Sequence, residues 1–179
     1  MEPFLIALLA HAASGGTDVV LNHQLIAKIP SRPNAGAEQC LHCARELVFA
    51  AIFVALAWFE WHGVAALLIA GLLLTELLIS GVDTVIEFDT RTLPVPERVL
   101  HYFLFINLGV VITLVGQALL AWGALPTQLL PVTYSWPSWA LTVLAAIALA
   151  WSVRDGLNVQ ERRKRGRAQA HPAPAPGQG

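Results

Sequence analysis

Five long apolar segments, separated by short polar or proline-containing stretches, constrain this chain more than any other feature. We place candidate helices at residues 3–28, 38–61, 64–87, 97–122 and 139–153. At about 1.5 Å per residue, a helix such as the first can cross a bilayer with some tilt. Only 13% of the residues are charged, against roughly a quarter in an average soluble domain. The sequence therefore predicts an all-α, integral membrane helical bundle of five transmembrane helices over residues 1–155.

The positive charges predict how this bundle is oriented. Lysines and arginines fall at one set of helix ends, and the opposite ends and their loops contain none. By the positive-inside rule the basic side is cytoplasmic, which puts the N-terminus outside and the C-terminus inside. Tryptophans gather at the other interface, as in an aromatic belt: Trp58, Trp61, Trp122, Trp136 and Trp139. We therefore expect a multi-pass protein of a bacterial inner (cytoplasmic) membrane.

The last part of the chain is polar. Residues 161–167 form a polybasic run, which we expect to be attracted to anionic lipid. We do not expect nucleic-acid binding, because nothing else in the chain resembles a nucleic-acid module. The last dozen residues are rich in Ala, Pro and Gly and are predicted to be disordered. Residues 156–179 are thus predicted to be a basic, then disordered, cytoplasmic tail.

The stretch from Asp83 to His101 brings acids and a histidine together between two apolar segments. Asp83 and Glu87 are four residues apart at the end of one segment, and Glu97 and His101 are four apart at the start of the next. Side chains at this spacing share one face of a helix. The proline-containing turn at residues 94–96 folds the two faces towards each other. Such a hairpin is suited to holding a charged ligand, and we predict a metal centre.

The first half of the chain repeats this pattern, with acids before a turn and a Glu/His pair after it. In the predicted topology these residues share one level, at or just inside the cytoplasmic interface. Ionisable groups inside a membrane are costly unless they are paired or bound. A mixture of carboxylates and imidazoles suits iron, manganese or zinc. We therefore predict two divalent ions, iron before manganese or zinc, with these candidate ligands: Asp18, His23, Glu38, His42, Asp83, Glu87, Glu97 and His101.

Further polar residues are expected around the ligands or against a substrate: Asn22, Arg45, Glu46, Glu76 and Arg98. Glu76 falls near the middle of its segment, which favours a role behind the ligands or in proton relay. The two arginines would orient carboxylates or bind an anionic head group. His11 is a further candidate ligand. The pattern assigns no residue to catalysis itself.

The ligand pattern over residues 18–101 resembles the di-iron carboxylate four-helix proteins, among them membrane-associated oxidases and hydroxylases such as alternative oxidase. Those families use Glu-x-x-His, whereas this chain has Glu-x-x-x-His twice, at residues 38–42 and 97–101. The longer spacing still presents both side chains on one face. The resemblance implies an oxidoreductase that acts with dioxygen on a lipid or quinone from the bilayer. The whole chain is also similar to small bacterial multi-span membrane proteins without an assigned activity.

Other metal chemistries remain open. Zinc in the same site would activate water for hydrolysis of a lipid-linked substrate. Haem b is a rival cofactor, since His11, His42 and His101 could be axial ligands between helices. A homo-oligomer or a cytoplasmic redox partner is compatible with either chemistry.

Three alternatives need no resident metal. A carrier for protons or metal ions would use Glu76, Asp83 and Asp18 as its pathway. A structural or assembly subunit would dock a cytoplasmic partner with its charged face. In the simplest alternative, the acids of the hairpin form ion pairs with Arg91 and Arg98.

Smaller signals carry less weight. Cys40 and Cys43 are too close in sequence for a disulfide between them to hold distant parts of the chain together. The sequence has no second cysteine pair to complete a zinc site. We interpret them as small helix residues and assign them no role. His62 is expected at the surface of the outer turn, and Asn107 is expected to bond across helices.

Overall fold

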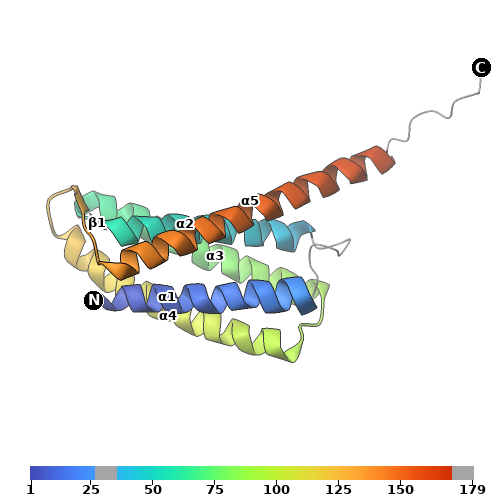
Figure 1. Cartoon of the computed structure of the whole chain (residues 1–179), viewed down its shortest axis with the longest axis horizontal. Helices are drawn as coiled ribbons and strands as arrows, with labels where there is room; N and C mark the ends of the chain where they lie inside the picture. The colour runs from blue at the N-terminus through green and yellow to red at the C-terminus, as the bar shows by residue number, and fades with distance from the viewer. Residues whose placement is uncertain (27–35, 171–179) are drawn as a thin grey trace, which may run out of the picture.

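The computed structural model of the chain describes residues 1–26 and 36–170, without the side chains of residues 23, 24, 163 and 165–170. Its helices run alongside one another in a single bundle (Figure 1). They are α1 (Pro3–Thr17), the π-helix η1 (Asp18–Ile26), α2 (Gly36–Trp58), α3 (Ala66–Thr90), α4 (Val95–Gly123) and α5 (Trp136–Ala170). The described residues hold five helical spans that are long and apolar enough to cross a membrane, as the sequence predicts.

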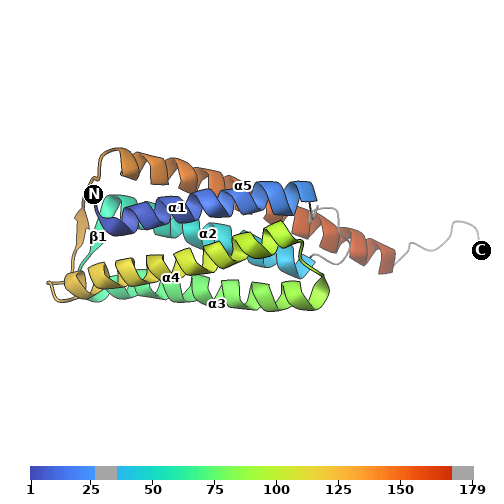
Figure 2. The same cartoon turned by 90° about the horizontal axis from the view of Figure 1, so that it is seen from below.

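Apolar residues fill the interior of the bundle and also lie on its outer surface. Helix α2 packs against α5 and α3, and α1 packs against α4 (Figure 2). The buried core includes Leu5, Leu8, Ile52, Leu56, Ile69, Val111 and Leu141. Leucines also point outwards, such as Leu67 at 70% and Leu120 at 80% exposure. A helix that is apolar all round is typical of a membrane span, because lipid is then the solvent of its outer face.

The first and last helices differ from their predicted bounds. The segment predicted as one helix over residues 3–28 is α-helical to Thr17 and continues as a π-helix from Asp18. Gly15, Gly16 and Thr17 are weak helix formers just before this change. The last helix, predicted to end at residue 153, continues to Ala170. Residues 154–170 contain no proline and several arginines, together with Lys, Glu, Gln, Leu and Ala residues that also favour a helix.

This extension carries the last helix into the residues predicted as a basic tail. Residues 156–170 belong to α5, which projects beyond the rest of the bundle (Figure 1). The remaining residues of the predicted disordered tail, 171–179, lie outside the described part of the chain, as do residues 27 and 28.

A small antiparallel sheet at the N-terminal end of the bundle is absent from the all-α prediction. Strand β1 (Phe59–Trp61) pairs with β2 (Leu129–Pro131), with Glu60 opposite Leu130. Helix α2 therefore ends at Trp58, and not at residue 61, because the backbone of the next three residues pairs with the loop after α4. The sheet ties the α2–α3 turn to the α4–α5 loop.

Two smaller predictions can be compared with the structure. His62, expected at the surface, is only 4% exposed. Its Nε2 lies 2.9 Å from Glu60 Oε2, and its Nδ1 lies 3.2 Å from Gln128 Nε2. His62 is therefore buried beside polar residues of β1 and of the loop just before β2. The sequence did not indicate this. The predicted interhelical bond of Asn107 is confirmed, since its Nδ2 donates to the carbonyl of Ala7 at 3.0 Å.

Gly63 begins the short 3₁₀ turn (Gly63–Ala65) before α3 and has a φ of 57°. A Cβ there would lie 2.7 Å from Cα and 2.8 Å from N of Thr127. We expect Gly63→Ala to lower the free energy of unfolding by about 2 kcal/mol or more, since a left-handed residue with a Cβ costs roughly 1–2 kcal/mol before any clash. Denaturant unfolding in detergent measures this. Gly71→Ala in α3, where a Cβ meets nothing within 4 Å, is the control; equal effects would contradict the expectation.

Candidate metal centre

Buried ionisable side chains gather at one end of the bundle. This is the end at which α3 turns into α4 (Figure 2). The side chains come from η1, α2, α3 and α4: Asp18, Glu38, His42, Asp83, Glu87 and Glu97 are buried, and His101 is half-buried. Glu87 and Glu97 are 1% and 0% exposed. Carboxylates at such positions need cations or hydrogen-bond donors close by, because burying a lone charge is costly.

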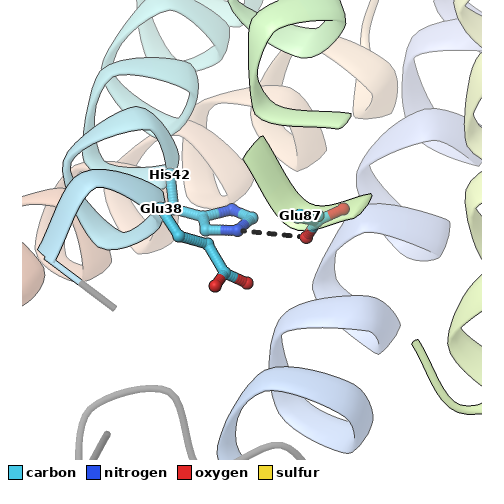
Figure 3. Close-up of side chains that lie close together, drawn as sticks. All are labelled: Glu38, His42 and Glu87. Carbon is cyan, nitrogen blue, oxygen red and sulfur yellow. Dashed lines mark ion pairs between the residues drawn. The ribbon is translucent and has the colours of Figure 1, made fainter. Parts of the chain in front are cut away.

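The first group of potential ligands joins α2 to α3. Glu38 and His42 project from α2 towards Glu87 of α3 (Figure 3). One ligand atom from each of the three lies within 4.8 Å of the others. His42 Nε2 is 3.9 Å from Glu87 Oε1 and 3.6 Å from Asp83 Oδ2. The four-residue spacing on α2 therefore puts both of its side chains against the acids of α3.

The second group joins α3 to α4 and includes Glu87 again. Glu87, Glu97 and His101 each offer a ligand atom, and these atoms also lie within 4.8 Å of one another. His101 Nδ1 is 3.4 Å from Glu87 Oε2. Glu87 thus directs Oε1 towards His42 and Oε2 towards His101. One carboxylate between two imidazoles is the arrangement expected of a bridging ligand.

The π-helix supplies a further acid behind His101. Asp18 Oδ2 lies 3.2 Å from His101 Nε2, the ring nitrogen that faces away from Glu87. Asn22 Nδ2 donates to the other oxygen of Asp18 at 2.6 Å. A π-helix is rare and often found at functional sites. Here it begins at the residue that contacts His101.

Arg91, the first residue after α3, connects the acids of both groups. Its guanidinium contacts Glu97 at 2.6 and 2.8 Å, Glu38 at 2.8 and 3.2 Å and Glu87 at 3.2 Å. Burial acts to lower the pKa of Arg91, but hydrogen bonds to Glu97 and Glu38 and the charges of these acids raise it above its ordinary value. Arg91 is therefore a permanent cation within the cluster.

A second arginine forms an ion-pair network deeper in the bundle. Arg45 Nε lies 3.2 Å from Glu76 Oε1, and its Nη1 lies 3.2 Å from Asp83 Oδ2. Ser80 donates to Glu76 Oε1 at 2.8 Å. Glu76, Ser80, Asp83 and Glu87 form one buried stripe of α3, in line with their spacing in the sequence. Asp83 joins this network to the metal-ligand groups through its contact with His42.

The predicted ligands come together, apart from His23, whose side chain lies outside the described part of the structure. Among the surrounding residues, Asn22, Arg45 and Glu76 contact the cluster as described above. Glu46 and His11 line a pocket beside it. Arg98 does not reach the cluster: its side chain is exposed, and no described carboxylate forms an ion pair with it. The predicted pairing of the acids with arginines is confirmed for Arg91 only.

Arg91 is a site residue that the residue pattern predicts only as an ion-pair partner of the hairpin acids. Its position four residues after Glu87 was the available signal, since that spacing lets the two side chains meet. Arg98 has the same charge and lies in the same hairpin. Only the path of the backbone after α3 distinguishes the two.

The donor atoms fit a pair of divalent ions. Each group offers two carboxylates and one imidazole, a set that suits iron, manganese or zinc. The ligand atoms of each group lie within 4.8 Å of one another. A cavity of about 10 Å³ lies beside the cluster and is lined in part by Asp83, Glu87 and His101. Because Arg91 contacts both oxygens of Glu97, an ion in the second group would share that carboxylate with it.

Comparison of the chain with protein-family models, curated proteins and solved structures gives no match. The resemblance to di-iron carboxylate proteins therefore stays a prediction from the ligand pattern. The contacts among the buried acids, histidines and arginines of this cluster are the basis for the function proposed below.

Proposed function

We propose that the chain is a membrane-spanning metalloprotein with a dinuclear carboxylate/histidine site, holding iron in the first instance, that acts as an oxidoreductase on a lipid or quinone. The observation that carries the proposal is that two potential ligand groups share Glu87. The charge distribution of the sequence supports an inner-membrane protein with its N-terminus outside and this site near the cytoplasmic face.

In this proposal each helix supplies a defined part of the site. Glu38 and His42 would hold one ion, Glu97 and His101 would hold the other, and Glu87 would contribute to both groups. The geometry at His101 supports this division. Its Nδ1 faces the bridging acid, whereas its Nε2 lies beside an acid of the π-helix. A carboxylate behind a ligating histidine fixes its ring orientation and tautomer.

Two iron ions held there would supply redox chemistry with dioxygen. The chain itself positions the ligands and limits access of water, because the ligand candidates Glu87 and Glu97 are almost fully buried. Arg91 offsets part of the negative charge of the site through its contacts with three carboxylates. The apolar outer faces of the spans give a lipophilic substrate direct access from the bilayer.

Metal analysis of the full chain, purified in mild detergent, tests the proposal. We expect two iron or manganese ions per wild-type chain, and loss of metal in Glu97→Ala and in His101→Ala, because both residues belong to the second group. His62→Gln, a buried histidine between β1 and the 3₁₀ turn before α3, is the matched control and should keep both ions. Dioxygen uptake with a reduced quinone, absent in His101→Ala, would then support the oxidoreductase function.

Other outcomes separate the alternatives. Two zinc ions would favour hydrolysis of a lipid-linked substrate. A folded wild-type protein without metal would contradict the proposal. It would favour the ion-pair network, which the contacts of Arg91 with three buried acids already support as the second candidate.

A further inference from the structure

A pocket lies beside the metal centre, between α1, α2 and α5. Its volume is about 170 Å³. For comparison, an apolar protein cavity of about 150 Å³ holds one benzene molecule. Asp18, His42 and Arg45 line the side of the pocket that adjoins the metal centre, and mostly apolar residues of α1, the π-helix, α2 and α5 line the rest. The space therefore fits a single ring next to the proposed metal ligands.

Aromatic side chains form part of the walls. The rings of His11 and Phe49 lie 4.5 Å apart at an interplanar angle of 31°. Trp151 lines the pocket from α5. Flat ligands gain from stacking on such surfaces, in addition to the area that they bury.

Three polar atoms of the pocket residues are buried without a hydrogen-bond partner among the described residues. They are Nδ1 of His11, Oε2 of Glu46 and Nε1 of Trp151. His11 is only 4% exposed, and a buried polar atom left without a partner costs about 1–3 kcal/mol. The three atoms come from three different helices, α1, α2 and α5. A ligand that satisfies them must carry polar groups at more than one point.

This requirement distinguishes two lipophilic molecules. An acyl chain fills apolar space but offers no hydrogen bonds along its length. A quinone ring accepts hydrogen bonds at two carbonyl oxygens, and its reduced form donates from two hydroxyl groups. The indole N–H of Trp151 can donate to a carbonyl, and Glu46 can accept from a hydroxyl.

We infer that this pocket binds the ring of a membrane quinone or quinol, held between His11 and Trp151 and facing Glu46. The role of this pocket as a substrate site rests on the proposed function. Binding of the quinone to the pocket does not depend on that function. Gly16 lies at the pocket, and a Cβ there would meet nothing within 4 Å. A larger side chain at this position can therefore enter the pocket without displacing another helix.

Binding is tested on the full chain in detergent, with a benzoquinone that carries a ten-carbon tail as the probe and isothermal titration as the readout. Trp151→Phe and His11→Phe keep a ring and remove the polar atom, so we expect each to raise Kd about ten-fold. Gly16→Phe should raise Kd at least as much by occupying the space. Gly71→Phe in α3, at which a Cβ is equally unobstructed, is the matched control and should leave Kd unchanged.

Several results would overturn the inference. Among these are equal Kd values for wild type, Trp151→Phe, His11→Phe and Gly16→Phe, when thermal melting shows that all are folded. Binding of a ten-carbon alcohol as tightly as the quinone would identify an acyl-chain pocket instead. Repeating the titration after metal analysis separates the two proposals. Metal-containing protein that does not bind quinone contradicts only this inference, and metal-free protein that binds it in a Trp151-dependent way contradicts only the metal site.

Discussion

Glu87→Gln is expected to remove both metal ions, whereas His42→Ala should remove mainly the ion of its own group. The reason is that Glu87 belongs to both ligand groups and presents a different oxygen to each histidine. Glutamine keeps the size of the side chain and loses the charge that a bridging ligand needs. Metal content per folded chain, measured by mass spectrometry after gel filtration, gives the result.

Glu76→Gln is the matched control for this experiment. Glu76 lies on the same buried stripe of α3 and is 0% exposed, but it belongs to neither ligand group. Its partner Arg45 keeps a second acid, Asp83, in the variant. We expect the control to retain both ions. Retention of one ion in Glu87→Gln would show that the two groups bind metal independently and would refute the bridging role.

Removing the Arg91 side chain is expected to have the largest effect on stability. Arg91 contacts three carboxylates, of Glu38, Glu87 and Glu97, which are all nearly fully buried. Breaking a buried ion pair by removing one partner typically costs about 3–5 kcal/mol, because a buried charge is left uncompensated. We expect a loss of this size in the free energy of unfolding of Arg91→Met, measured by denaturant unfolding in detergent without added metal.

Arg98→Met provides the comparison, because it removes the same charge from an exposed position in the same hairpin. It should change the unfolding free energy by less than about 0.5 kcal/mol. Adding metal should reduce the defect of Arg91→Met, since bound cations can take over part of the compensation. If the two arginine variants are equally stable without metal, Arg91 is not the main counter-charge of these acids.

The sequence was sufficient to predict the five spans and the gathering of the acids. The length of an apolar segment identifies a span because a helix needs about 20 apolar residues to cross the hydrocarbon core of a bilayer. The spacing of Glu76, Ser80, Asp83 and Glu87 predicts one face of a helix, and the structure buries all four. Both conclusions need only the length of the apolar segments and the spacing of residues along a helix.

Features that depend on where the backbone turns could not be predicted. Arg91 lies in the site because it follows α3 in an extended conformation, with φ −159° and ψ 158°, and its side chain returns to the acids. The change to a π-helix at Asp18 and the pairing of β1 with β2 depend likewise on packing between distant segments. Hydropathy and residue spacing contain no signal for the extended backbone at Arg91, for the π-helix or for the pairing of the two strands.

The length of α5 gives the protein a stiff spacer. The last candidate span ends at Arg162, but the helix continues to Ala170. At about 1.5 Å per residue, the part after the span is about 12 Å long, roughly the diameter of one helix. Because this part is one continuous helix, it extends away from the bundle and does not fold back onto it (Figure 1). A binding partner or fluorescent reporter attached there would therefore be held at a distance from the bundle that the helix sets.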